Sequence, residues 1–183
     1  MSRLIERERT DLSGMRCSAT FSPCEQYRYL LTWRWSEEPL LVAWMLNPST
    51  ATHEKLDPTI AGLVSRARAW GMGGVRVINL FAFRATDPKD MKAAADPVGP
   101  DNDAITADVL HSATILGDTV ICGWGAHGNH RGRDADAIEI ARGHGVALHC
   151  LDANRDGSPK HPLYIKRDMK PRVWLPGAVS AAA

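Results

Sequence analysis

An apolar run that ends abruptly in polar turn residues constrains the fold of this chain most strongly. The run covers residues 40–46, and it is followed by Asn47, Pro48, Ser49 and Thr50. A nearly unbroken apolar segment of this length is typical of a strand covered on both faces, as in a parallel sheet. Asparagine, proline, serine and threonine favour turns and helix caps. The sequence therefore predicts a buried strand with a polar carboxyl end, which is where open α/β sheets bind ligands.

Length and charge limit the classes of protein to which the chain can belong. Its 183 residues are enough for one domain with its own core. The formal net charge of +1 gives no global electrostatic reason to expect nucleic acid, although a local basic face is compatible with it. No apolar run reaches transmembrane length, and the charged residues 1–10 lack a signal-peptide core. We therefore expect a cytoplasmic protein without a membrane partner.

The four cysteines do not form a recognisable metal-binding motif. Cys17, Cys24, Cys122 and Cys150 include no CxxC pair. Cys122 and Cys150 fall in expected buried strands, where cysteine packs as a small apolar residue. We expect reduced, structural thiols, and neither a metal nor another cofactor.

Strands and helices are expected to alternate along most of the chain. Residues 1–14 read as a flexible arm, and the aromatic, β-branched segment 17–35 predicts a β-hairpin. Buried strands are then expected at residues 40–46, 75–83, 119–125 and 146–151. Helices are expected between them, at about residues 57–70, 101–113 and 134–142.

This order predicts a single α/β domain over residues 15–175. Its expected architecture is three-layer αβα, with a central, mainly parallel sheet of about four strands and an N-terminal β-hairpin. Residues 176–183 are expected to be a disordered tail. Because parallel strands end at the same edge of a sheet, four polar loops should share one rim. These loops are residues 47–50, 84–87, 124–130 and 154–161.

Two asparagines at this rim have both a structural and a functional interpretation. Asn47, taken alone, is most simply a turn or helix-cap residue. Asn79 lies within an expected apolar strand, where its amide must find hydrogen-bond partners. It either bonds a neighbouring loop backbone or presents one donor and one acceptor to a planar ligand such as a nucleobase.

Histidines and arginines make the later loops candidates for substrate contact. No carboxylate or cysteine is placed to complete a metal site with His127 and His130, so we expect their loop to contact phosphate or substrate. Arg131 and Arg133 precede an expected helix N-terminus, where an anion is favoured. His161 follows a turn and precedes a proline, and it is either a site residue or an exposed loop residue.

Many separate motifs, in the same order, resemble the "domain of unknown function 1643" family. The resemblance covers roughly residues 25 to 165, and the family name supplies no activity. The motifs are LNPSTA at residues 46–51, DPTI at 57–60, RAWG at 68–71, VINLFAFRATDP at 77–88, DPVGPDND at 96–103, GWGAHG at 123–128 and HPLY at 161–164.

A more distant resemblance, to the uracil-DNA glycosylase superfamily, implies an activity. The order of a strand ending in Asn-Pro, a strand asparagine, Gly-x-Gly-Ala and a late His-Pro is similar to that superfamily. By this resemblance Asn47 orients the attacking water, Asn79 reads the base edge, and His161 stabilises the departing base. The implied fold is uracil-DNA-glycosylase-like.

We therefore expect a hydrolase that cleaves the N-glycosidic bond of a nucleobase-containing substrate, of which DNA is one form. Asn47 and His161 are the expected catalytic residues. One alternative is a non-catalytic module that binds nucleotides or nucleic acid at the same rim. Another is a different hydrolase or transferase with His127 and His161 as acid and base. The oligomeric state is left open. The expected substrate-binding residues are Pro48, Ser49, Thr50, Asn79, Arg84, Trp124, His127 and Arg131.

Overall fold

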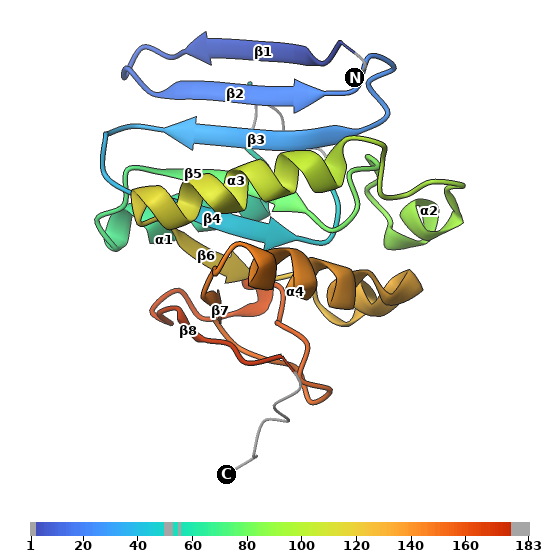
Figure 1. Ribbon diagram of the computed structural model, residues 1–183. Helices are drawn as coiled ribbons and strands as arrows, with labels where there is room; N and C mark the ends of the chain where they lie inside the picture. The colour runs from blue at the N-terminus through green and yellow to red at the C-terminus, as the bar shows by residue number, and fades with distance from the viewer. Residues whose placement is uncertain (1–2, 50–52, 55, 177–183) are drawn as a thin grey trace.

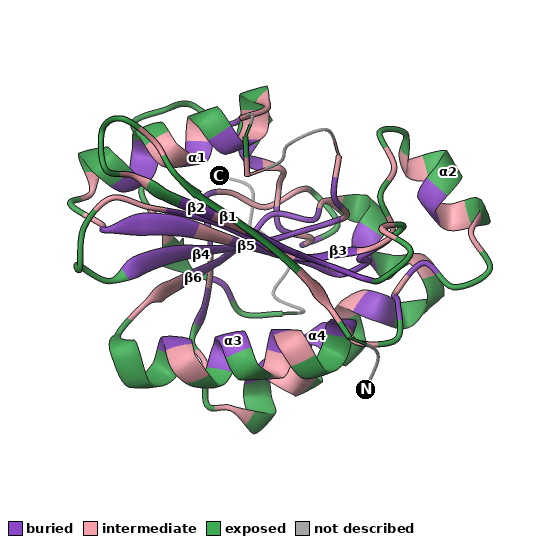
Figure 2. Cartoon of the chain, turned by 90° about the horizontal axis from the view of Figure 1, so that it is seen from above, coloured by how far each residue is buried: buried purple, intermediate pink, exposed green. Residues whose placement is uncertain are grey.

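A wide, twisted sheet with helices on both faces makes up the protein (Figures 1 and 2). The computed structural model describes residues 3–49, 53–54 and 56–176. Within these ranges the sheet has eight strands in the order β1-β2-β3-β5-β4-β6-β7-β8. The strands are β1 (Ile5–Thr10), β2 (Arg16–Phe21), β3 (Arg28–Arg34), β4 (Leu40–Met45), β5 (Gly74–Asn79), β6 (Thr119–Cys122), β7 (Leu148–Cys150) and β8 (Arg172–Val173).

Four parallel strands form the centre of the sheet. β4 lies between β5 and β6 and is parallel to both, and β7 lies parallel beside β6. The predicted mainly parallel arrangement is thus confirmed for the centre. The complete sheet is wider than the four strands expected, because β3 pairs antiparallel with β5 and so joins the hairpin to the same sheet. The short strand β8, which was not predicted, pairs antiparallel with β7 at the other edge.

The N-terminal region is more ordered than the sequence suggested. β2 and β3 form the predicted antiparallel hairpin. The prediction of a flexible arm is wrong for Ile5–Thr10, which pair along their whole length with β2. Cation–π contacts help to hold this strand, since Arg7 lies over the ring of Phe21. Residues 1–2 of the expected arm, and residues 177–183 of the expected tail, lie outside the described residues.

The helices cover the two faces of the sheet unequally. α1 (Pro58–Ala69) covers one face, and α3 (Asn102–Leu116) and α4 (Arg133–Gly143) cover the other (Figure 2). These three helices match the predicted ones. The short α2 (Pro88–Ala93) was missed within a segment expected to be a loop, and η1 (Ala126–Gly132) and η2 (Pro162–Tyr164) are 3₁₀ turns. No helix in the described ranges is long and apolar enough to cross a bilayer.

The double cover explains the unbroken apolar run of β4. All of its side chains are buried, with at most 5% of any residue exposed. Leu41 and Ala43 pack with the α1 face, whereas Val42 and Trp44 pack with α3 and α4. The predicted buried strand is therefore confirmed, and its rigid end fixes where Asn47 is held.

The second buried strand is shorter than its apolar run. A strand was expected over residues 75–83, but β5 ends at Asn79. Leu80 and Phe81 follow as irregular chain, and their N–H groups donate to the carbonyls of Met45 and Leu46, each at 2.9 Å. Asn79 consequently stands at the end of its strand and not inside it, next to the end of β4.

Candidate functional site

A cavity of about 620 Å³ opens at the carboxyl ends of the central strands. Its wall is formed by the ends of β4 and β5, by the loop after β6, by the N-terminus of α1 and by the loop before η2. Most of the predicted site residues meet here. Asn47, Ser49, Asn79, Trp124, His127 and His161 line the cavity, whereas Pro48, Arg84 and Arg131 do not, and Thr50 lies outside the described residues.

Asn47 is held in one orientation by the loops around it. Its side-chain nitrogen Nδ2 donates to the carbonyls of Pro48 at 3.1 Å and Ala85 at 2.7 Å. Among the described residues both hydrogen bonds use the nitrogen, so the side-chain oxygen Oδ1 can accept a bond from a ligand or a water. Asn47 therefore combines a structural role, which ties the β4 and β5 loops together, with an acceptor on the cavity wall.

Asn79 is a buried polar side chain with an unused donor. The residue is 1% exposed and lines the cavity, and its Nδ2 finds no partner among the described residues. Leaving such a group unsatisfied costs about 1–3 kcal/mol. A bond from this side-chain nitrogen to a loop backbone, which was one of the two alternatives for Asn79, is absent from that part of the chain. A ligand carbonyl in the cavity would satisfy the donor.

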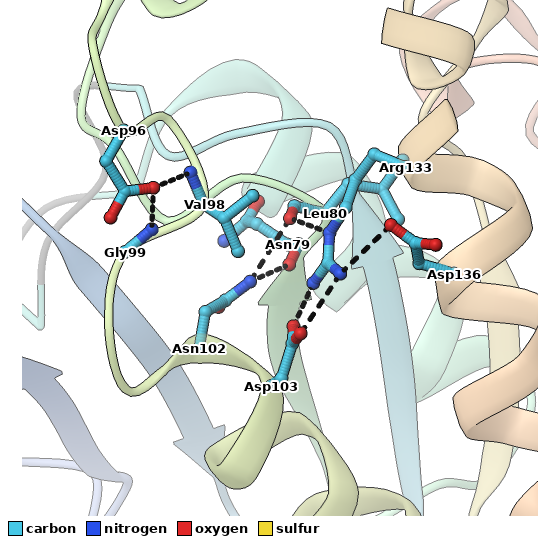
Figure 3. Close-up of polar contacts among 9 residues, drawn as sticks. All are labelled: Asn79, Leu80, Asp96, Val98, Gly99, Asn102, Asp103, Arg133 and Asp136. Atoms are coloured by element: carbon cyan, nitrogen blue, oxygen red, sulfur yellow. Dashed lines mark hydrogen bonds and ion pairs between the residues drawn. The ribbon is translucent and has the colours of Figure 1, made fainter. Parts of the chain in front are cut away.

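Side chains from α3 and α4 clamp the backbone at Asn79 (Figure 3). Asn102 Nδ2 donates to the carbonyls of Asn79 at 3.0 Å and Leu80 at 3.1 Å. Arg133 Nε donates to the Leu80 carbonyl at 2.8 Å, while its guanidinium pairs with Asp103. Arg133, expected beside a bound anion, is instead 3% exposed and part of this clamp. The clamp places Asn79 without touching its side-chain amide.

His161 is a neutral donor at the other side of the cavity. Its Nδ1 accepts the N–H of Leu163 at 3.3 Å, which assigns the proton of the neutral ring to Nε2. Burial lowers the pKa of His161, and the negative charge of Asp57 opposes this effect. The imidazole is thus neutral at pH 7, with Nε2–H as a hydrogen-bond donor. Arg66 of α1 holds the segment next to His161 in place, because it donates to the carbonyl of Ile165, just after η2, at 2.7 Å.

Two charged residues of the cavity were missed by the sequence analysis. Arg28 of β3 is 3% exposed, and its burial lowers its pKa to about 10, while the charge of Asp57 raises it. It therefore stays cationic at neutral pH. Asp57 caps α1, and its Oδ1 accepts the N–H of Ile60 at 2.8 Å. In the sequence, Asp57 was marked by its position before the expected helix and by the DPTI motif, and neither pointed to a site; no sequence signal marked Arg28, near the start of an expected strand.

The tryptophan of the cavity wall is also part of the core. Trp124 is 2% exposed, and its ring packs edge-on against Trp44 at 5.7 Å and Trp174 at 5.5 Å between centroids. A β-carbon on Gly128 would come within 2.2 Å of this ring, so the glycine after His127 is required for packing. Trp124 thus belongs both to the core and to the cavity wall.

The remaining predicted residues have other partners. The exposed His127 lies 3.2 Å from Lys92, between Nδ1 and Nζ. Arg84 donates to the carbonyl of Glu25 at 3.0 Å, outside the cavity. Arg131 donates to the carbonyls of residues 94 and 95 and so supports the segment after α2. Among the described residues, no group of three or more His, Cys, Asp or Glu side chains could hold a metal ion.

Fold and site together define an α/β protein with a ligand-sized cavity, lined by apolar and several polar side chains, at the ends of its parallel strands. A family model described as "Protein of unknown function (DUF1643)" matches residues 28–163, which is most of the chain. The chain therefore belongs to this family. The match includes all of the cavity residues named above.

Other comparisons add little to the family assignment. No curated protein matches the chain. Among solved structures, it is similar to the hetero-hexameric glutamate dehydrogenase from Thermus thermophilus in its leucine-bound form, with 13% sequence identity and a TM-score of 0.32. That match covers 85% of this chain and 36% of the dehydrogenase chain.

Proposed function

We propose that the chain hydrolyses the N-glycosidic bond of a nucleobase-containing substrate bound in the cavity. The observation that carries the proposal is the buried Nδ2 of Asn79, which lines the cavity without a partner among the described residues. A carbonyl of a planar base would satisfy this donor. The cavity volume of about 620 Å³ also suits a ligand of nucleoside or nucleotide size.

The other polar groups suit the charges that this reaction develops. Breaking the bond makes the sugar oxocarbenium-like and the base anionic. Asn47 Oδ1 can accept a hydrogen bond from the attacking water, since its amide nitrogen is held by two carbonyls. The Nε2–H of His161 can donate to the departing base and stabilise its negative charge.

The distant resemblance to the uracil-DNA glycosylase superfamily supports the same roles. Within the proposal, the fold is of that type and the protein acts in the cytoplasm. A base in duplex DNA would have to leave the stack to reach the cavity. Free nucleosides and nucleotides need no such step. The test therefore compares oligonucleotides with free nucleosides.

The test is the release of free base, measured by liquid chromatography. Single-stranded and duplex oligonucleotides and free nucleosides with varied bases are offered to the purified protein. We expect release by the parent protein and a loss of about 10²–10³-fold in Asn47→Ala and in His161→Phe. Asn129→Ala changes an exposed asparagine of η1 outside the cavity and serves as the control. No release from any substrate, or unchanged release by Asn47→Ala, would refute the proposal.

A non-catalytic binding module is the second candidate, and one observation favours it. The two carbonyls bonded by Asn47 Nδ2 are also what a purely structural turn asparagine would bond. This candidate predicts saturable quenching of Trp124 fluorescence by nucleosides or oligonucleotides, without base release. The basic residue Lys160 lines the cavity next to His161, so Lys160→Gln should weaken this binding.

A further inference from the structure

Asp57 is the acidic side chain of the cavity, and only one of its two carboxylate oxygens caps α1. No other Asp or Glu is found among the described residues that line the cavity. Its Oδ1 accepts the N–H of Ile60 at 2.8 Å, whereas Oδ2 accepts no hydrogen bond from the described residues. The carboxylate is therefore fixed in place by the start of α1 and keeps one oxygen available to the cavity.

The charge of Asp57 reaches groups on two separate elements. It raises the pKa of Arg28, on β3, and that of His161, in the loop before η2. A charge affects groups in this way only at short range, so the carboxylate lies near both of them. Asp57 thus shares the cavity with the buried cation and the neutral donor.

The proposed hydrolysis lacks a proton acceptor without this residue. Asn47 can orient a water, but a neutral amide does not take up its proton at pH 7. A carboxylate within the same cavity can do so, as a general base. His161 is not suited to this part, because its Nδ1 is bonded to Leu163 N–H and its Nε2 carries a proton.

We propose that Asp57 is the general base that takes a proton from the attacking water. This inference rests on the function proposed above. The water oxygen bonds to the anomeric carbon while one of its protons moves to Asp57 Oδ2. The C–N bond breaks, and its electron pair stays on the base nitrogen, which His161 Nε2–H stabilises. The base then takes up a proton and Asp57 loses one to solvent. One water is consumed, and free base and sugar are formed.

The test separates the chemistry of Asp57 from its helix cap. Asparagine and serine cap helices about as well as aspartate, so Asp57→Asn and Asp57→Ser keep the cap and remove the base. We expect base release to fall by about 10²–10⁴-fold in kcat, with KM little changed.

Asp87 provides a matched control from the same chain. It also precedes a proline and caps a helix, α2, with Oδ1 accepting the N–H of Lys89 at 2.8 Å, yet it does not line the cavity. Asp87→Ser should release base at the parent rate. Asp57→Gly, which also preserves capping to within a few tenths of a kcal/mol, should regain part of its rate when formate is added.

Each outcome decides between the inference and the function on which it rests. Loss of rate in both cap-preserving variants, with formate rescue of Asp57→Gly, supports the general base. If the parent releases base and Asp57→Asn does so equally fast, the inference is overturned and the proposed function stands. If the parent releases no base from any substrate, both are overturned.

Discussion

Asn79 and Asn102 are two buried asparagines whose side-chain nitrogens differ in their hydrogen bonds. Asn102 donates to two carbonyls, whereas the side-chain nitrogen of Asn79 has no partner among the described residues. Leucine at position 79 has the same branched shape as asparagine and removes the unsatisfied donor. We expect the free energy of unfolding of Asn79→Leu to stay unchanged or to rise by up to about 2 kcal/mol, with ligand binding lost.

Asn102→Leu is the control, and it should lower the free energy of unfolding by about 1–2 kcal/mol, because the two hydrogen bonds that it loses outweigh the removal of its buried Oδ1, which has no partner among the described residues. Urea denaturation followed by tryptophan fluorescence measures both variants. If Asn79→Leu were destabilised as much as Asn102→Leu, the amide of Asn79 would serve the fold and not a ligand.

His161 should make the stability of the protein depend on pH in a defined direction. Burial lowers its pKa in the folded state, below the value of about 6.5 in the unfolded chain. Between these values the unfolded chain binds more protons, so the contribution of His161 is full above about pH 6.5 and is lost as pH falls through the folded value. The drop in the free energy of unfolding on going from about pH 7.5 to about pH 5.5 should be larger for the parent than for His161→Asn, which retains a capping side chain. An equal drop in both proteins would exclude this role of His161.

At the scale of elements, the end of β5 depends on contacts that the local sequence does not reveal. The apolar residues continue to Phe83, but the strand ends at Asn79. It ends there because side chains of α3 and α4 donate hydrogen bonds to the carbonyls of Asn79 and Leu80. Asn102 and Arg133 come from α3 and α4, so no local signal marks the change. The motif at residues 96–103, which helped to identify the family, includes Asn102 and Asp103 and has this structural use.

Arg133 is expected to be the most sensitive member of this clamp. Arg133→Met keeps the apolar stem and removes the bonds to the Leu80 carbonyl and to Asp103. We expect the free energy of unfolding to fall by about 2–3 kcal/mol, since charged hydrogen bonds are worth about 1.5–3 kcal/mol each and part of their value is lost to solvent screening at the exposed Asp103.

Arg142→Met, later on α4, is the matched control. Arg142 pairs with Glu139 on the exposed surface, so its loss should change the free energy of unfolding by less than about 0.5 kcal/mol. Thermal or urea unfolding of the two variants compares them directly. Similar values for the two would mean that the clamp does not stabilise the end of β5.

At the scale of the whole molecule, the centre of the sheet could be predicted and its edges could not. Apolar runs bounded by turn residues located the four parallel strands, and their shared rim correctly brought Asn47, Asn79 and His161 to one cavity. Arg28 and Asp57 were not predicted to line the cavity, because their place in it depends on which distant elements the fold brings near them. The strand β1 was missed because its charges resemble those of a solvated arm.

The same charges make β1 a poor site for pairing with a second copy of the chain. Glu6 and Glu8 lie on one face of the strand and Arg7 and Arg9 on the other. In a two-fold antiparallel pair of identical edges, opposed residues come from the same face, so Glu would meet Glu and Arg would meet Arg. Like charges directly opposite one another are destabilising. The alternation therefore protects an open edge of the sheet.

Removing these charges should create a self-associating edge. Replacement of Glu6 and Glu8 by threonine and of Arg7 and Arg9 by valine removes the repulsion. The strong strand formers offset the cation–π contact that Arg7 loses, so the backbone pairing with β2 stays in place. We expect this fourfold variant to shift to a larger species in light scattering as its concentration rises, while the parent shows no such β1-dependent shift. Glu139→Thr with Arg142→Val removes a surface charge pair from α4 and should leave the size of the species unchanged. If the fourfold variant keeps the parent's size at every concentration, repulsion between like charges is not what keeps the β1 edge unpaired.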